Sequence, residues 1–302
     1  MELLKKHYEL IIKNITARLT KNPITYFFIL SFLISWILWI PLLYGHFRFG
    51  WTSWEGNPWT NYRTLLGILG ALGPAISAII MTNLIHGKNG IKILLKRVIQ
   101  WRVNALWWLI AFYSWWLISS ILAISLSLKP TPDITMGFVF ALINIPGMLI
   151  IQLPLLVGIF GEELGWRGFA LPKLLNKFDP IVSSLILTLP WIFWHAPLML
   201  FQNWRGNLPI VSFLFNYIIL LVPLALIFTW FFRKTKGSVL LAIIFHSSLN
   251  LTFNAYSIAL DLSESASKLL RDYTIYALWI IAMIIVIHYY FKKWKQKNRN
   301  KK

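Results

Sequence analysis

Two adjacent carboxylates, Glu162 and Glu163, follow a long stretch of the chain that contains no charged side chain. Two of the six histidines, His195 and His246, also lie within apolar segments, whereas the others lie at or near the ends of such segments. An acidic side chain in apolar surroundings can serve as a general base, and a nearby imidazole can share the proton that it removes. A charge at membrane depth is costly unless it is paired, so these four residues predict a functional polar site within the membrane.

The local spacing gives these residues supporting neighbours. Glu163 and Arg167 are four positions apart with the acid first, which is the favoured order for an ion pair on a helix. Glu162 projects about 100° away from Glu163 around the helix and is free to face a different partner. His246 and Asn250 are also four positions apart and are predicted to share one helix face.

Small and helix-breaking residues accompany the site. Four glycines repeat at a spacing of three, four and three residues, which predicts a stripe of bare backbone that permits close helix packing: Gly158, Gly161, Gly165 and Gly168. Pro190 and Pro197 bracket His195 and are predicted to leave the carbonyls of Ile186 and Phe193 without helical donors. Unpaired backbone groups in a membrane are tolerated mainly beside a polar cavity. These features support a cavity at His195.

The elements that must position these residues are membrane helices. Of the 302 residues, 58% are hydrophobic and 13% are charged, whereas roughly a quarter are charged in soluble domains. The chain has no cysteine, which excludes disulfides, iron–sulfur clusters and thiolate metal sites. The basic residues flank the apolar segments and form no single patch, so the net charge of +19 indicates contacts with anionic lipid and not with nucleic acid.

The apolar segments predict an all-α polytopic membrane protein with a single domain over residues 1–302. A transmembrane helix needs about 20 mostly apolar residues. Eight segments meet this requirement, at 25–44, 64–86, 104–128, 137–162, 180–201, 209–232, 238–260 and 273–291. The eight-helix core at 25–291 contains the motifs at 162–250. Residues 1–23 are predicted to form an interfacial amphipathic arm, and residues 292–302 a basic cytoplasmic tail.

The distribution of Lys and Arg predicts the orientation of the helices. With eight spans, both termini lie on the same side of the membrane. The termini and the connections on their side carry 23 basic residues, whereas the opposite side carries six. Because basic residues accumulate on the cytoplasmic side, both termini are predicted to be cytoplasmic.

A hairpin argument predicts the depth of the site. The segment 178–180, Phe-Asp-Pro, is typical of a turn between two helices. Glu162 lies 16 residues before this turn and His195 lies 15 residues after it, so the two come level in an antiparallel pair. His246 is about ten residues from the loop at Lys236, or roughly 15 Å along a helix. All three are therefore predicted to meet in the cytoplasmic half of the membrane.

Three motifs in this order resemble those of the CPBP family, also called the Abi or CAAX-protease family, whose members are intramembrane endopeptidases and bacteriocin-immunity proteins. The motifs are Glu162-Glu163-xxx-Arg167, a later xxx-His195, and His246-xxx-Asn250. The eight-span arrangement is also similar. The second motif of the family usually begins with Phe, but here its first position is Trp191. Both are aromatic packing residues, so the difference leaves the expectation for His195 intact and argues against a close match to the eukaryotic branch.

The resemblance implies a role for each matched residue. Glu162, with His195, would activate a water molecule for attack on the scissile carbonyl, and His246 and Asn250 would stabilise the oxyanion. The substrate would be a membrane-associated peptide or protein, with or without a lipid anchor. The Lys-, Ile- and Asn-rich composition favours a prokaryotic plasma membrane as the location, and in a eukaryote the endoplasmic reticulum would replace it.

The sequence leaves the metal requirement open. Glu162, His195 and His246 would make a three-ligand zinc site with an open position for water. However, the chain has no His-Glu-x-x-His motif and no evident carboxylate to orient the two histidines. We therefore expect metal-free chemistry without a cofactor, with a zinc enzyme as the alternative.

Other functions remain as rivals. The absence of cysteine and of a Gly-x-Ser-x-Gly motif disfavours a covalent nucleophile, and no aspartate lies within a span to form an aspartyl dyad. A bacteriocin-immunity or peptide-binding protein would keep the fold without cleavage. A proton-coupled transporter could use the Glu–His cluster as a relay, but the chain shows no inverted repeat.

Overall fold

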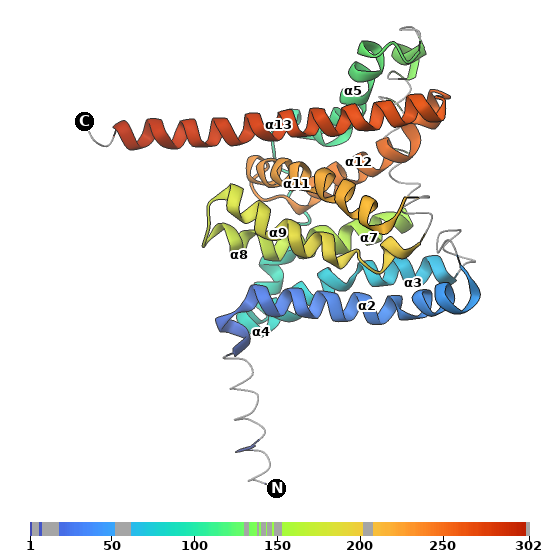
Figure 1. Cartoon of the computed structure of the whole chain (residues 1–302). Helices are drawn as coiled ribbons and strands as arrows, with labels where there is room; N and C mark the ends of the chain where they lie inside the picture. Colours follow the sequence, from blue (N-terminus) through green and yellow to red (C-terminus); the bar gives the residue numbers. More distant parts are fainter. Residues whose placement is uncertain are drawn as a thin grey trace.

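The computed structural model describes residues 1, 6–7, 18–51, 62–129, 133–137, 139, 143, 147, 153–201 and 208–299. Within these residues every regular element is a helix, and most of the helices lie side by side in a bundle (Figure 1). The prediction of an all-α polytopic membrane protein is confirmed. The predicted interfacial arm at 1–23 lies mostly outside the described residues.

Twelve helical elements are described, and they follow one another along the chain. They are α2 (Pro23–Phe49), α3 (Tyr62–Ala71), α4 (Gly73–Lys96), α5 (Ala105–Ser125), α7 (Leu153–Glu163), the π-helical η1 (Leu164–Ala170), α8 (Leu171–Leu175), α9 (Pro180–Trp194), the 3₁₀ turn η2 (Leu198–Leu200), α11 (Ile210–Lys234), α12 (Val239–Ala259) and α13 (Glu264–Arg299).

Five of the helical stretches are long and apolar enough to cross a membrane: Pro23–Phe49, Tyr62–Lys96, Ala105–Ser125, Ile210–Lys234 and Glu264–Arg299. Two further apolar helices, Pro180–Trp194 and Val239–Phe253, are shorter. Part of the predicted span at 137–162, between 138 and 152, lies outside the described residues, which contain its final part as α7. Seven of the eight predicted segments thus correspond to described apolar helices, and five of these meet the length required for a span.

Three predicted boundaries differ from the structure. The second span is broken at Leu72, since Pro74 lies in the first turn of a new helix, α4. The fifth span ends early, at Trp194, because Pro197 disfavours helical backbone in the residue before it. The eighth helix extends beyond the predicted boundary at 291, since α13 continues to Arg299 and includes most of the predicted basic tail at 292–302. Lysine and arginine favour helix, so α13 extends beyond its apolar part.

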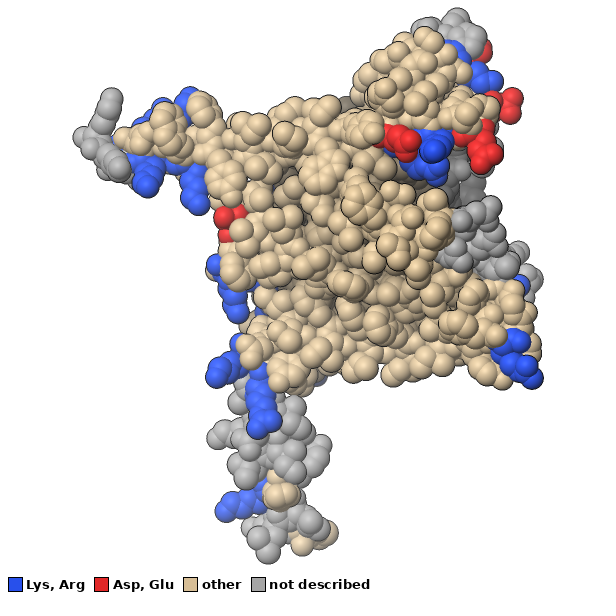
Figure 2. All heavy atoms as spheres, in the orientation of Figure 1, with Lys and Arg blue, Asp and Glu red and all other residues tan. Residues whose placement is uncertain are grey.

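The start of α2 and the end of α13 lie on the same side of the bundle, at the left in Figure 1. On the face shown in Figure 2, Lys and Arg residues occur along this side, and a broad band without charged side chains follows the length of the helices. We call this side the basic end, after Arg233 and Lys234 at the end of α11 and the lysines at the end of α13. The arrangement agrees with termini on one side of a membrane.

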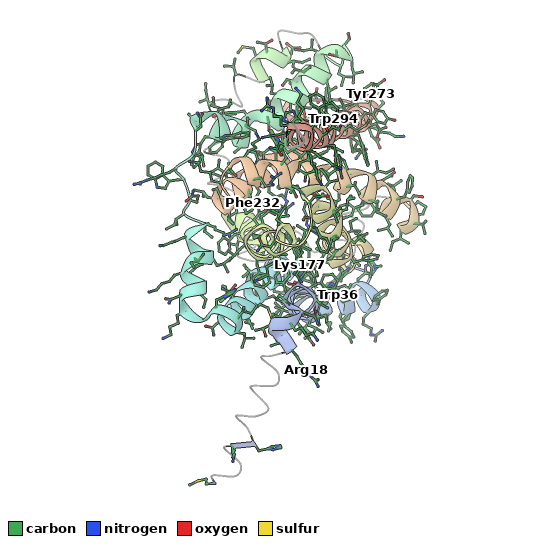
Figure 3. The ribbon with its side chains drawn as sticks, turned by 90° about the vertical axis from the view of Figure 1, so that its left-hand side faces the viewer. Arg18, Trp36, Lys177, Phe232, Tyr273 and Trp294 are labelled. Carbon is green, nitrogen blue, oxygen red and sulfur yellow. The ribbon has the colours of Figure 1, made fainter. Side chains whose placement is uncertain are left out.

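Indole N–H groups form hydrogen bonds between neighbouring helices inside the bundle. Figure 3 shows the bundle from the basic end. Trp39 of α2 donates to the carbonyl of Gly67 in α3 at 3.1 Å, and Trp115 of α5 donates to the carbonyl of Phe245 in α12 at 2.9 Å. Each bond pairs two buried polar groups that would otherwise face hydrocarbon. These tryptophan hydrogen bonds therefore define how far adjacent helices are shifted relative to each other along their axes.

Three glycines of the predicted stripe, Gly158, Gly161 and Gly165, pack against the junction of α3 and α4. A Cβ atom on Gly161 would collide with the carbonyl oxygen of Ala71, and one on Gly165 would collide with Pro74. No side chain fits between these backbones, so glycine is required for the close approach. This contact places the end of α7 in the interior of the bundle.

Candidate active site

The two glutamates lie where the helix geometry changes. α7 ends at Glu163, and the chain continues as the π-helical turn η1 from Leu164 to Ala170. Short π-helical segments are rare and occur often at functional sites, because their wider turn changes the direction of the side chains. Here the side chain of Glu163 is completely buried, whereas that of Glu162 is 12% exposed. The adjacent carboxylates therefore occupy different environments.

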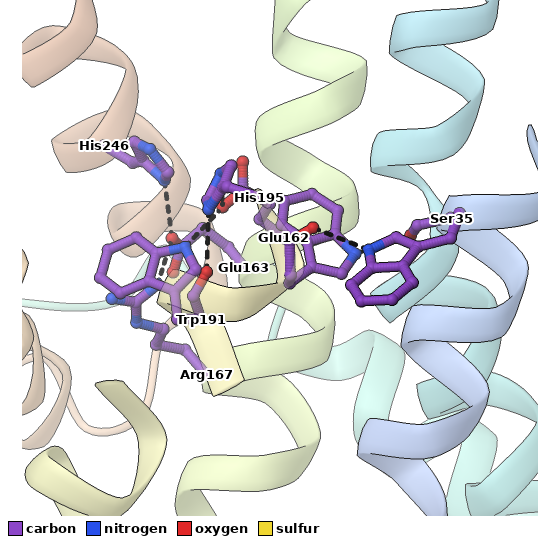
Figure 4. Close-up of polar contacts among 9 residues, drawn as sticks. Ser35, Glu162, Glu163, Arg167, Trp191, His195 and His246 are labelled. Carbon is purple, nitrogen blue, oxygen red and sulfur yellow. Dashed lines mark hydrogen bonds and ion pairs between the residues drawn. The ribbon is translucent and has the colours of Figure 1, made fainter. Parts of the chain in front are cut away.

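Glu163 is the centre of a buried ion cluster (Figure 4). Its Oε1 atom accepts hydrogen bonds from Arg167 Nη1 at 2.7 Å and from His246 Nδ1 at 2.8 Å. The guanidinium carbon of Arg167 lies 4.3 Å from the ring centre of Trp191 and 4.4 Å from that of Phe228. Two aromatic faces and a carboxylate thus compensate a cation that is 1% exposed. The predicted Glu163–Arg167 pair is confirmed.

The contact between Glu163 and His246 corrects one expectation. The sequence offered no evident carboxylate to orient the histidines, but Glu163 Oε1 accepts from His246 Nδ1. A histidine ring held in this way has a defined orientation, with its Nε2 atom directed away from the carboxylate. The nearest carboxylate contact of His246 is therefore with the second glutamate and not with Glu162.

Glu162 faces α9. Its Oε2 atom accepts a hydrogen bond from Trp191 Nε1 at 2.8 Å and lies 4.0 Å from His195 Nε2 (Figure 4). The gap to the imidazole is too long for a direct hydrogen bond. Glu162 and His195 do come level, as the hairpin argument predicts, and Asp179 caps α9 by accepting from the backbone N–H groups of Ile181 and Val182.

The protonation of His195 follows from its backbone contact. His195 Nδ1 lies 2.8 Å from the carbonyl oxygen of Trp191. A carbonyl can only accept, so the proton of the neutral ring must be on Nδ1. The Nε2 atom that faces Glu162 then carries a lone pair. The site therefore presents two acceptors, Glu162 Oε2 and His195 Nε2, with a separation that suits a bridging water molecule.

Trp191 does more than the packing role expected from the sequence. Its indole N–H donates to Glu162, its carbonyl accepts from His195, and its ring covers Arg167. One residue thus positions the general-base candidate, its histidine and the supporting cation. The sequence contained a signal for this role, because Trp191 stands where the related motif usually has phenylalanine. Of these two side chains, only tryptophan has an N–H group that can donate a hydrogen bond.

The end of α9 is held by α2. His195 occupies the C-cap position, and the indole of Trp194 donates to Ser35 Oγ at 2.7 Å. Pro197 cannot act as the helical donor to the carbonyl of Phe193, as predicted, but this carbonyl is not left unpaired, because Ala196 N donates to it at 3.0 Å. The helix ends here in a tight turn that supplies a closer donor. Pro190 remains within α9 and cannot donate to Ile186.

Two further side chains lie near the histidines. Asn250 is half-buried on α12, one turn beyond His246, as the spacing predicts. Among the described residues its side chain makes no hydrogen bond to Glu162 or to His195. Tyr217 of α11, which the sequence did not single out, packs edge-on against His195 with ring centres 5.7 Å apart. Only the fold brings this tyrosine to the site.

The donor set does not match a metal centre in the part of the chain that the structure describes. There, no group of three His, Cys, Asp or Glu side chains is arranged to hold a metal ion. The bond from His246 Nδ1 to Glu163 is of the kind that orients a zinc-bound histidine, so it removes one argument that the sequence offered against zinc. In their described positions, however, Glu162, His195 and His246 are not gathered as a three-ligand metal site.

Comparison with known proteins agrees with the motifs. Residues 144–252 match the family model described as Rce1-like, type II CAAX prenyl endopeptidase. This segment contains both glutamates, both histidines, Arg167 and Asn250. The resemblance to the CPBP family is confirmed for this segment. A curated relative, CAAX prenyl protease 2 of Methanococcus maripaludis, is 31% identical over 136 residues. The match covers 41% of this chain and 46% of the relative, so the chain spans about half the length of that relative.

Proposed function

We propose that this integral membrane protein is an endopeptidase that hydrolyses a peptide bond of a membrane-associated peptide or protein. One observation carries the proposal: Glu162 Oε2 and His195 Nε2 face each other 4.0 Å apart within a bundle of apolar helices. The name of the relative, a CAAX prenyl protease, favours a substrate with a prenylated C-terminal tail. Such a lipid would hold the tail at the membrane beside the site.

In the proposed reaction, Glu162 removes a proton from a water molecule held between its Oε2 atom and His195 Nε2. The water oxygen attacks the scissile carbonyl and forms a tetrahedral intermediate. The carbon–nitrogen bond then breaks, and the proton held by Glu162 passes to the leaving nitrogen. The products are an amine and a carboxylic acid, and Glu162 returns to its ionised form. No covalent enzyme intermediate is needed.

His246 and Asn250 are proposed to stabilise the oxyanion. The bond from His246 Nδ1 to Glu163 directs Nε2 away from the ion cluster. For Nε2 to donate to an oxyanion, the ring must carry protons on both nitrogens, and Glu163 accepts one of them. Asn250 lies on the same face of α12, one turn away. A preorganised donor in such a site contributes about 3 kcal/mol to the stabilisation of the transition state.

The proposal is tested with Glu162→Gln and His195→Gln in the full chain, reconstituted in nanodiscs with a farnesylated C-terminal peptide as substrate. Each variant is expected to reduce kcat by at least about a hundredfold, because the base or its partner is lost. Glu264→Gln changes an acidic side chain in the first turn of α13 and should leave kcat unchanged. Retention of cleavage by both site variants, at unchanged helicity, would refute the mechanism.

A further inference from the structure

A second cavity lies between α9, α11 and α13 at the basic end, apart from the candidate active site. Its volume is about 570 Å³, and none of the six motif residues lines it. The first turns of α9 contribute Ile181 and Ser184, and the last turns of α11 and the second half of α13 form the other walls. A cavity of this size can hold a ligand of several hundred daltons. The hydrolytic reaction does not use it.

The wall from α11 changes in character along the helix. Leu226, Thr229 and Arg233 line the cavity and recur at helical spacing, so they form one stripe on the same face. The stripe begins with an apolar residue, continues with a hydroxyl group and ends with a cation. About 10 Å of helix separates its first and last members.

The wall from α13 has the same order. Ile285, Tyr289, Lys292 and Lys293 line the cavity, again on one face of the helix. This stripe also passes from an apolar residue through an aromatic residue to two cations. Both helices run towards the basic end, so the two gradients have the same direction.

A hydrogen bond between α11 and α13 shows which residues of the two walls lie at the same position along the helix axes. Trp279 Nε1 of α13 donates to the carbonyl oxygen of Ile219 in α11 at 3.0 Å. The two helices are parallel, so residues equally far beyond Ile219 and Trp279 lie at about the same position along the axes. Seven residues further on, Leu226 lies beside residue 286, and fourteen residues further on, Arg233 lies beside Lys293. The apolar residues of the two walls therefore face each other, and so do the cations.

Within the described residues, no carboxylate forms an ion pair with the cations that line this cavity. These cations are Arg233, Lys234, Lys292 and Lys293. The nearest acidic residue in sequence to the α9 wall, Asp179, is used to cap that helix. Clustered like charges are unfavourable without a counter-charge, so the mouth of the cavity is complementary to an anion.

We propose that this cavity binds an anionic glycerophospholipid of the leaflet at the basic end. Lys292, Lys293 and Arg233 contact its phosphate, and an acyl chain lies against Leu226 and Ile285. The hydroxyl and aromatic residues between them lie at the level of the glycerol esters. Along both walls, apolar residues are followed by polar or aromatic residues and then by cations, which matches the acyl chain, ester and phosphate groups of such a lipid. A free phosphate ion or another soluble anion would need only the cations.

The test compares lipid retention by native mass spectrometry of the full chain with phosphatidylglycerol and with phosphatidylcholine of the same acyl chains. The wild-type chain is expected to retain phosphatidylglycerol preferentially. Lys292→Gln/Lys293→Gln should weaken this retention by roughly fivefold for each lysine, or on the order of twentyfold together. Ile285→Trp, which fills the apolar wall without changing charge, should weaken it as well.

The matched control is Lys295→Gln/Lys297→Gln, which removes the same charge from the same helix outside the cavity; Lys295 Nζ instead lies 4.6 Å over the ring of Phe291. This control should retain the lipid. Equal loss in the control, equal retention of phosphatidylcholine, or full displacement by soluble glycerol 3-phosphate or by an acidic peptide would overturn the proposal. The measurement involves no cleavage, so its outcome is independent of the proposed peptidase activity.

Discussion

At the scale of single residues, the site depends on how two adjacent glutamates are given different partners. Glu163 is buried between Arg167 and His246, and its charge is compensated there. Glu162 keeps some exposure and contacts an indole N–H and an imidazole across a gap. Both bonds go to Oε1 of Glu163, and its buried Oε2 has no hydrogen-bond partner in the described structure. The buried carboxylate therefore orients Arg167 and His246, and the partly exposed one is available to act on water.

Trp191→Phe tests whether the indole N–H positions Glu162. Phenylalanine keeps an aromatic ring over Arg167 but cannot donate to Glu162 Oε2. Because a hydrogen bond to a charged group contributes more than a neutral one, kcat is expected to fall roughly ten- to hundredfold, with KM nearly unchanged.

The control for this substitution is Trp39→Phe, which removes an indole hydrogen bond to the carbonyl of Gly67 outside the site. It should lower the stability of the protein and leave kcat as it is. A Trp191→Phe enzyme with wild-type kcat would show that the ring alone is required.

At the scale of elements, the site depends on a close contact between α7–η1 and the α3–α4 junction. Glycines at the contact let the backbone carrying both glutamates approach Ala71 and Pro74. The turn at Asp179 then returns the chain so that α9 presents Trp191 and His195 to Glu162. The positions of the acid and its histidine therefore follow from one packing contact and one capped turn.

Gly161→Ala should destabilise the protein by about 1–3 kcal/mol, because the new methyl group would meet the backbone of Ala71 and Leu72, which cannot move aside as a side chain can. Thermal or denaturant unfolding in detergent measures the change. Gly147→Ala is the matched control, since a Cβ there meets none of the described residues within 4 Å. Equal stability of the two variants would contradict the packing argument.

At the scale of the whole molecule, four helices bring their polar residues to one place inside an apolar bundle. Glu162 and Glu163 come from α7, Trp191 from α9, Tyr217 from α11 and His246 from α12. Cations lie at both ends of the bundle in Figure 2, and those at the basic end include the ones that line the cavity between α9, α11 and α13. The proposed hydrolytic site and the proposed lipid site are thus separate products of one helix arrangement.

Removal of metal ions tests the chemistry of the assembled site. Since Glu162, His195 and His246 do not gather as a metal-ligand set in the described chain, cleavage is expected to persist in excess 1,10-phenanthroline. The rate of peptide cleavage before and after chelation is the measurement. Loss of activity that stoichiometric zinc restores would establish a metal enzyme instead.

Local features could be predicted from the sequence because neighbouring residues produce them. The apolar segments, the turn capped by Asp179 and the Glu163–Arg167 pair each depend on a few adjacent positions. Errors arose at helix ends, where the tight turn at Ala196 supplied the carbonyl of Phe193 with a donor. Short-range spacing does not specify which of several competing backbone donors a helix end will use.

Composition and periodicity were enough to predict a helical membrane protein with two glutamates and two histidines in or beside apolar segments, because they specify which segments enter a membrane. The hydrogen bond from His246 to Glu163, and that from the indole of Trp191 to Glu162, became visible only in the folded chain. These bonds join residues 83 and 29 positions apart. They depend on the rotation and height of each helix, which the packing of the whole bundle sets.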